Sequence, residues 1–244
     1  MQKFLDDRKG DITVEKKKYK VSFYGEMIGN CQEIEKLKNP LKDSTKGYLR
    51  GLCDAQAGQY SGLFTLDHMP DYVLEDLVEK LPLPEEYRKT DNDKLNYYEY
   101  LILPVLAFAD RTKILRFVVA KSEVDAFGLD CSVTLDNFHD HGDEEKDFLT
   151  LCNESEISLI IPKRTIPDMM SEEVLTAILA GNFVLAPFNP AYLNFFPEDS
   201  IIFYMNFFDA QEKIEYYLAH LEEREKIAEN GQKIVQQMLQ GQGV

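Results

Sequence analysis

The sequence has 244 residues, of which 44% are hydrophobic, and this size fits one large domain or two small ones with a substantial core. The 43 acidic and 27 basic residues give a formal net charge of −16, which argues against nucleic acid and anionic membranes as partners because both require a basic surface. No apolar run approaches the roughly 18 residues of a membrane helix, and the charged start has no signal-peptide core, so we expect a cytoplasmic protein without membrane insertion.

The first predicted strand follows a polar start. Residues 1–18 carry mainly polar and charged side chains, and we expect them to form a linker or a frayed end. The segment Tyr19–Tyr24 then alternates apolar and polar side chains and ends at Gly25, which is typical of a strand that runs into a glycine turn. We expect the loop after it, residues 25–30, to face the ligand-binding end of the sheet.

Helical spacing of the apolar residues replaces the strand pattern after this loop. Candidate helices lie in residues 45–62, 71–81 and 94–120, and Pro104 interrupts the last of them. We therefore predict a mostly helical excursion over residues 31–112, between the first two strands.

Two short strands and an acidic loop come next. Val124–Gly128 and Ser132–Leu135 are strand candidates, and the loop Asp136–Asp147 carries six acids beside one lysine. Acidic groups at this density repel one another and stay hydrated unless a cation gathers them. We therefore predict that this loop is exposed to solvent and holds no metal.

A metal site is the alternative for this loop, since His139, Asp140, His141 and Asp143 lie close together in sequence. Two histidines at positions i and i+2 can share one face of a strand and bind a transition metal. No third anchor of the usual kind accompanies them, and a solvated loop with two incidental histidines explains the pattern more simply. The four cysteines form no CxxC pair, so we expect reduced thiols rather than a zinc ribbon or a disulfide framework.

The following stretch predicts a βαβ unit. Ile157–Ile161 and Phe183–Ala186 are apolar runs of the kind found in strands that are buried on both faces. The helix between them, about Glu172–Ala180, has Ser171 in the position of an N-cap and Gly181 in that of a C-terminal glycine.

We expect the functional site in the loop Pro162–Ser171, because ligands of open α/β sheets bind at the carboxyl ends of such strands. Lys163 and Arg164 in this loop could hold a diphosphate, although surface charges after a strand are an equally good explanation. Glu172 and Glu173 oppose an anion at the start of the helix but could accept hydrogen bonds from sugar or ribose hydroxyls. Neither a glycine-rich phosphate loop nor a GxSxG elbow occurs.

The last part of the chain adds one strand and two helices. Ile201–Tyr204 is the strand candidate, and Asp209 with Glu212 three residues later has the form of a capping box that opens a helix. Ile227 and Val235 belong to the apolar stripe of a final helix. Strands that alternate with helices predict one α/β domain with a mainly parallel sheet.

Several stretches resemble the C-terminal half of CgeB-like glycosyltransferases, which are bacterial spore-maturation and surface-glycosylation proteins with a GT-B arrangement. They are YKVSFYGEMIG, KGYLRGLCDAQAGQYSG, ADRTKIL with Arg111, NESEISLII, and the closing IEYYLAHLEEREKIAENGQKIV. The resemblance runs from Tyr19 to the end of the chain. It implies a Rossmann-like, donor-binding C-terminal domain over residues 19–244, with a helical insertion after the first strand.

The resemblance also implies a ligand and a partner. The ligand is a nucleotide-diphosphate sugar, bound as a substrate, and no cofactor is expected. The acceptor-binding N-terminal domain of the family would be missing here or supplied separately. Phosphate contacts are expected from Gly25, Glu26, Met27, Arg164 and Thr165, and hydroxyl contacts from Glu172, Glu173 and Thr176.

This chain departs from the family pattern at four positions of the polar site. Ile160 replaces an asparagine, Met169 a glycine, Glu173 an arginine, and Thr176 an acidic residue that is expected near the ribose. The resemblance therefore leaves two functions open. The first is transfer of a sugar from the nucleotide to a protein or a cell-surface glycan, and the second is a catalytically silent binding or assembly module. In either case we expect no transferase activity from this chain alone.

Overall fold

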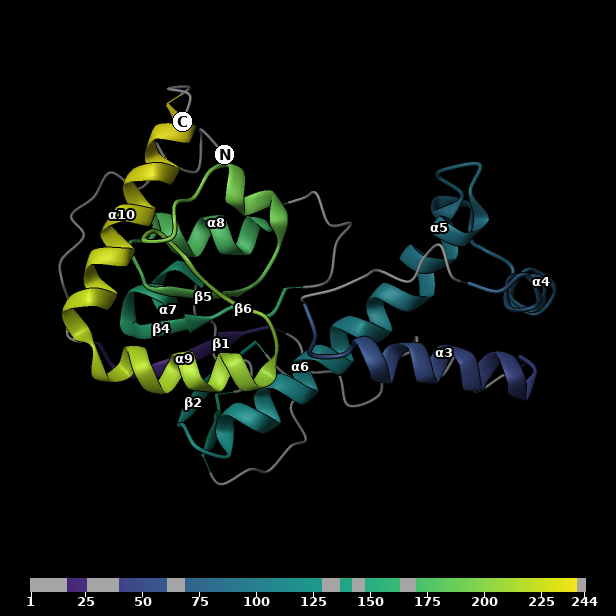
Figure 1. Cartoon of the computed structure of the whole chain (residues 1–244), viewed down its shortest axis with the longest axis horizontal. Helices are drawn as coiled ribbons and strands as arrows, with labels where there is room; N and C mark the ends of the chain where they lie inside the picture. The colour runs from purple at the N-terminus through teal and green to yellow at the C-terminus, as the bar shows by residue number, and fades with distance from the viewer. Residues whose placement is uncertain are drawn as a thin grey trace.

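The computed structural model describes residues 17–25, 40–60, 69–128, 137–141, 148–162 and 170–240. Within them, six parallel strands form one sheet with the order β3-β2-β1-β4-β5-β6 (Figure 1). The strands are β1 (Tyr19–Tyr24), β2 (Val124–Phe127), β3 (Phe138–Asp140), β4 (Ser155–Leu159), β5 (Val184–Pro187) and β6 (Ile202–Tyr204). This arrangement confirms the predicted α/β class and its parallel sheet.

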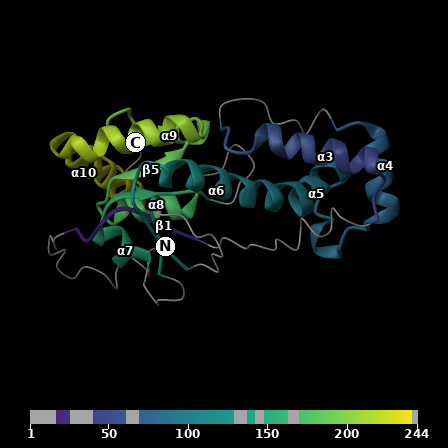
Figure 2. The same cartoon turned by 90° about the horizontal axis from the view of Figure 1, so that it is seen from below.

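Helices cover both faces of the sheet. α6 (Leu103–Val119) and α9 (Phe207–Ala219) pack on one face, and α7 (Phe148–Glu154) and α8 (Glu172–Leu179) lie on the other, as the view in Figure 2 shows. α10 (Leu221–Leu239) contacts both α8 and α9 and so connects the two layers. The inner strands β4 and β5 can bury side chains on both of their faces because helices cover each side of the sheet.

The insertion between β1 and β2 is helical. It contains α3 (Asp43–Gln56), α4 (Asp71–Lys80) and α5 (Asp93–Tyr97), and it continues into α6, which leads back to the sheet. Figure 1 shows these helices extending away from the sheet. They enclose a hydrophobic core of their own, in which Leu49 and Leu77 are fully buried.

α6 belongs to both cores. Val105 and Leu106 near its start pack inside the insertion, whereas Ile114 and Val118 near its end pack against the sheet. Its 17 residues give it a length of about 25 Å. This helix therefore fixes the insertion relative to the carboxyl ends of the strands.

A π-helical turn precedes Pro104. Residues Tyr98–Ile102 form this turn (η3), and Pro104 lies directly after it in the first turn of α6. Proline cannot donate a backbone hydrogen bond, and its ring clashes with the carbonyl four residues earlier in an α-helix. The wider π-turn relieves that clash without ending the helix. The predicted interruption at Pro104 is therefore a local change of helix type.

β3 lies inside the segment that we predicted to be an acidic loop, and that prediction was wrong for residues 138–140. The segment pairs with β2 in parallel register, and Phe138 is half-buried against the sheet core, whereas His139 and Asp140 are exposed. A three-residue edge strand depends on backbone pairing and not on an apolar run, so the pattern missed it. The predicted strand Ser132–Leu135 lies outside the described residues.

The start of α9 corrects the predicted capping box. Asn206, and not Asp209, is the N-cap residue, and its side chain accepts hydrogen bonds from the N–H groups of Phe208 (2.9 Å) and Asp209 (3.1 Å). The carboxylate of Asp209 in turn accepts a hydrogen bond from the N–H of Met205 at 2.7 Å. A reciprocal cap therefore exists, but it begins three residues earlier than predicted.

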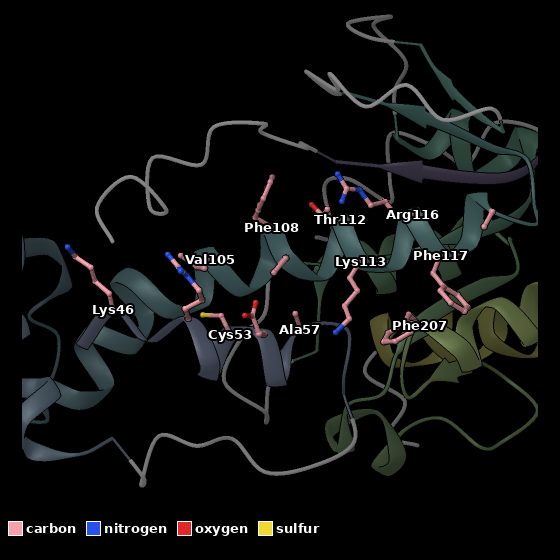
Figure 3. A pocket seen from close by; sticks show the side chains of 14 residues that line it. Lys46, Cys53, Ala57, Val105, Phe108, Thr112, Lys113, Arg116, Phe117 and Phe207 are labelled. Carbon is pink, nitrogen blue, oxygen red and sulfur yellow. The ribbon is translucent and has the colours of Figure 1, made fainter. Parts of the chain in front are cut away.

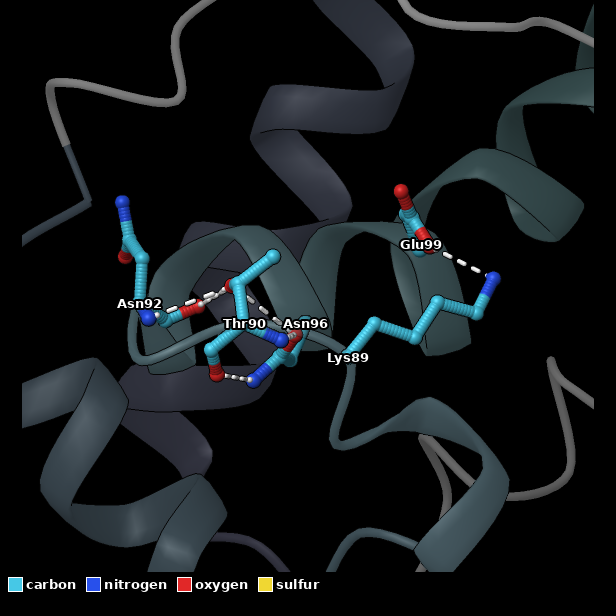
Figure 4. A network of polar contacts seen from close by, with 5 residues as sticks. All are labelled: Lys89, Thr90, Asn92, Asn96 and Glu99. Carbon is cyan, nitrogen blue, oxygen red and sulfur yellow. Dashed lines mark hydrogen bonds and ion pairs between the residues drawn. The ribbon is translucent and has the colours of Figure 1, made fainter.

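A polar network closes the tip of the insertion, between η2 (Glu85–Tyr87) and α5 (Figure 4). Asn92 caps α5 by accepting a hydrogen bond from the N–H of Lys94 at 3.1 Å. Asn96 is 3% exposed; its Nδ2 donates to the carbonyl of Thr90 (2.9 Å), and its Oδ1 accepts from the N–H and hydroxyl of Thr90 (3.2 Å each). One buried amide thus closes the loop before α5.

We expect Asn96→Ala to lower the free energy of unfolding by about 1–2 kcal/mol, because the substitution removes all three hydrogen bonds to Thr90. Lys89→Gln is the matched control from the same network. It breaks the Lys89–Glu99 ion pair (3.1 Å), whose lysine side chain is 60% exposed, and such pairs contribute at most about 1 kcal/mol. Urea unfolding followed by circular dichroism measures both variants, and equal losses would contradict the prediction.

Candidate functional site

The strand order places a topological switch point at the carboxyl ends of β1 and β4, where open parallel sheets form a crevice for ligands. These strands are neighbours, but the chain leaves β1 toward β2 on one side and β4 toward β5 on the other. The connections therefore diverge, as they do at the switch point of other open parallel sheets. Gly25 follows β1 directly, and Ile161 lies two residues beyond β4.

Arg111 lies at the base of this crevice. It comes from α6, is only 5% exposed, and its Nε donates a hydrogen bond to the carbonyl of Ile161 at 3.1 Å. Its guanidinium carbon is 5.9 Å from the ring centre of Phe23 in β1. A guanidinium is charged at every physiological pH and carries five N–H donors. The crevice therefore has a fixed positive charge beneath it.

The turn at Gly25 has no room for a side chain. Its φ is +156°, and a Cβ atom would lie 3.0 Å from the Phe23 ring and 3.3 Å from the guanidinium carbon of Arg111. The N–H of Gly25 donates to the carbonyl of Phe127 at 3.1 Å, which ties the turn to β2. The predicted glycine turn at the end of β1 is confirmed, and its backbone lies close to the buried cation.

The predicted hydroxyl contacts lie on α8, which begins at the same carboxyl edge as Gly25. Glu172 and Glu173 are exposed in its first turn, and Thr176 is half-buried one turn further on. The other predicted contacts lie outside the described residues; they are Glu26, Met27, Lys163, Arg164 and Thr165. The structure thus places the glycine turn and the helix start on one edge.

The start of α8 is capped from outside the helix. Ser171 occupies the N-cap position, but its side chain makes no capping hydrogen bond, which corrects our prediction. Its backbone N–H instead donates to the hydroxyl of Tyr192 at 2.7 Å. Burial raises the pKa of Tyr192 to about 12, the bond from Ser171 lowers it, and the Glu173 carboxylate adds to the rise. One backbone donor at this helix start is therefore already taken.

An exposed aromatic side chain flanks the crevice and was missed by sequence reasoning. Tyr24 ends β1 and is 41% exposed. Its ring centre is 5.4 Å from that of Phe148, and a Cβ atom at Gly128 would lie 3.2 Å from the Tyr24 ring. The signal in the sequence is its position as the last strand residue before the Gly25 turn.

The predicted metal-like group is dispersed. His141 Nε2 lies 2.8 Å from Asp125 Oδ1, a partner that the sequence pattern did not indicate. His139 and Asp140 are exposed on β3, and Asp143 lies outside the described residues. Among the residues that the structure describes, no group of three or more His, Cys, Asp or Glu side chains could hold a metal ion.

Comparison with known proteins gives a match over more than half of the chain. A family model described as glycosyl transferase-like matches residues 107–240, from the second turn of α6 to the end of α10. No curated protein and no solved structure matches the chain. In the described ranges, no helix combines the length and apolar character that crossing a membrane requires.

Tyr192→Phe removes the hydroxyl that caps α8, and we expect the free energy of unfolding to fall by about 1 kcal/mol at neutral pH. The difference depends on pH because folding raises the pKa of Tyr192 from its ordinary value of 10.0 to about 12. The Tyr192 hydroxyl makes its full contribution to the free energy of unfolding below about pH 10. This contribution is lost as the pH rises toward about 12, because Tyr192 ionises at a lower pH in the unfolded chain than in the folded one.

Urea unfolding of the wild type and the variant at a series of pH values measures this difference. Tyr72→Phe on α4 is the control, since Tyr72 is 49% exposed, and it should change stability little at any pH. A difference between wild type and Tyr192→Phe that stays constant through this alkaline range would contradict the prediction.

Proposed function

We propose that this chain binds a nucleotide-sugar donor in the crevice between β1 and β4. The proposal starts from the family, since the chain belongs to the glycosyl transferase-like family. The observation that carries this proposal is the buried guanidinium of Arg111 beneath the Gly25 turn. This cation attracts a diphosphate, and the turn lets the phosphates approach the backbone because no side chain stands in the way.

We assign the diphosphate contacts to both loops of the crevice. The backbone amides of Gly25, Glu26 and Met27 bind from the side of β1, and the side chains of Arg164 and Thr165 bind from the side of β4. A hydrogen bond between a guanidinium and a phosphate oxygen is about twice as strong as one between neutral groups. Arg164 therefore contributes most of the affinity in this assignment.

The hydroxyl and ring contacts follow from the neighbouring elements. Glu172, Glu173 and Thr176 on α8 can accept hydrogen bonds from sugar or ribose hydroxyls. The exposed ring of Tyr24 offers a flat surface on which a base or a sugar can stack.

The acceptor is assigned to a second domain, as in CgeB-like enzymes. In a GT-B arrangement, donor and acceptor meet in the cleft between two domains, and the described residues form one sheet. Holding both reactants together lowers a reaction barrier by up to about 7–11 kcal/mol. We therefore propose that a separate domain presents a protein or a cell-surface glycan in the cytoplasm, and that this chain alone does not transfer a sugar.

A catalytically silent binding or assembly module is the second candidate. The start of α8 favours it, because Glu172 and Glu173 lie in the first turn and Tyr192 already occupies the N–H of Ser171. Two carboxylates at a helix start repel a diphosphate and cancel the attraction of the helix dipole for anions. This end of the crevice therefore weakens donor binding relative to an uncharged helix start.

Calorimetric titration with uridine, guanosine and thymidine diphosphates tests the donor site. We expect at least one of them to bind, and Arg164→Ala to weaken it at least about tenfold, because a hydrogen bond to a charged group is worth ~1.5–3 kcal/mol. Gly25→Ala should abolish binding, because its methyl group would meet the Phe23 ring and the Arg111 guanidinium. Lys226→Ala on the exposed side of α10 is the control and should bind as the wild type does.

The possible outcomes separate the two functions. Absence of binding for all three diphosphates would contradict the donor site and favour the silent module. Binding that survives both Arg164→Ala and Gly25→Ala would place the nucleotide elsewhere on the chain. Turnover of a nucleotide sugar by the isolated chain would overturn its predicted inactivity.

A further inference from the structure

A second pocket lies on the other face of α6. It has a volume of about 820 Å³, is open to solvent on one side, and is lined by α3, α6 and the start of α9 (Figure 3). Figure 3 shows Lys46 at one end and Phe117 and Phe207 at the other. Thr112 and Lys113 line it, whereas their neighbour Arg111 points to the sheet and contacts β4's terminal loop. The pocket is therefore separate from the crevice between β1 and β4.

The pocket is positively charged although the chain is strongly acidic. Lys46, Arg50, Lys113 and Arg116 line it, against the single carboxylate of Asp54, in a chain whose net charge is −16. Arg50 and Arg116 are exposed, and neither makes a hydrogen bond or an ion pair within the described part of the chain. Lys46 pairs with Asp43 at 3.7 Å, so the charges that lack a partner among the described residues are those of Arg50 and Arg116. Like charges repel one another, and an anion between the two guanidinium groups would relieve that repulsion.

One end of the pocket is aromatic. The rings of Phe117 and Phe207 have their centres 5.0 Å apart, and Phe208 packs against both at 4.6 and 4.4 Å. Phe208 remains 56% exposed. The ammonium group of Lys113 lies 5.1 Å from the ring centre of Phe207, so a cation and an aromatic face meet at this end.

The apolar floor completes the pocket. Cys53 of α3, Ala57 directly after α3, and Val105 of α6 line it and are each at most 6% exposed. Small-molecule sites are concave, mostly apolar and of about 300–1,000 Å³, with a few charged groups that orient the ligand. The pocket on α6 has each of these properties.

We propose that this pocket binds an aromatic organic anion, in which a phosphate or a carboxylate is joined to a flat apolar ring. The ring stacks at the Phe117 and Phe207 end, where offset or edge-on contact between aromatic groups is favourable. The anionic group pairs with Arg116, and Arg50 adds a second positive charge across the pocket. This site is independent of the donor site, because the two lie on different faces of α6.

Fluorescence anisotropy of naphthyl phosphate and of naphthoate tests the proposal on the full chain. The chain contains no Trp, so the naphthalene signal is free of indole emission. We expect at least one of the two anions to bind, and a difference between their affinities would distinguish a phosphate ligand from a carboxylate ligand. Neutral naphthol, and inorganic phosphate as a competitor, should bind at least about tenfold more weakly. Naphthol lacks the anionic group, and inorganic phosphate lacks the aromatic ring.

The double variant Arg50→Gln/Arg116→Gln should weaken the bound anion at least about tenfold, because it removes two charged hydrogen-bond donors. Lys226→Gln is the matched control for loss of a surface charge, and Arg164→Ala is the control for separation from the donor site. Both should leave the affinity of the probe unchanged. Ala109→Phe, which narrows the pocket without changing its charge and adds no indole, should weaken binding of the ring.

Three results would overturn the proposal. The first is an equal affinity of the double variant and the wild type for the anions. The second is binding of naphthol as tight as that of naphthyl phosphate, which would indicate unspecific apolar contact. The third is absence of binding by either anion. Circular dichroism checks that each variant folds, and Ala109→Phe decides the question if the double variant does not fold.

Discussion

The hydrogen bond from the buried Arg111 guanidinium to the carbonyl of Ile161 holds together the carboxyl edge of the sheet. Removing a permanent charge from water is unfavourable unless hydrogen bonds and contact with the face of an aromatic ring compensate for the lost hydration. Here a carbonyl beyond β4 accepts the hydrogen bond, and the ring of Phe23 in β1 lies beneath the cation. Three elements that are distant in sequence therefore converge on one side chain, and Gly25 must stay without a side chain above it.

The sheet was predictable because its strands have strong local signals. β1 alternates apolar and polar side chains before a glycine turn, β4 and β5 overlap the predicted apolar runs, and the helices have regular apolar stripes. Glycines at the element ends were also predictable, since Gly181 after α8 has φ +77° and Gly25 has φ +156°. Such backbone angles are unfavourable for residues with a side chain, so the sequence marks them directly.

The remaining features depend on partners that a local pattern does not contain. β3 exists because β2 offers its backbone at the edge of the sheet, and Asn206 caps α9 because the chain turns from β6 into the helix at that residue. The hydroxyl of Tyr192, which comes later in the chain, caps the start of α8 by accepting a hydrogen bond from the N–H of Ser171. The sequence pattern instead predicted that the side chain of Ser171 would be the cap. The resemblance to a family pointed to Arg111, but its position beneath Gly25 follows only from the path of α6 across the sheet.

The shared helix α6 has a consequence for how the chain unfolds. Its first turns are part of the hydrophobic core of the insertion, and its last turns are part of the core on the sheet. Melting either core exposes apolar surface on the same helix and removes the support of the other core. The insertion and the sheet should therefore lose structure in one cooperative transition, and the amide hydrogens of α3 should be protected from exchange by the stability of β1, although the two elements belong to different cores.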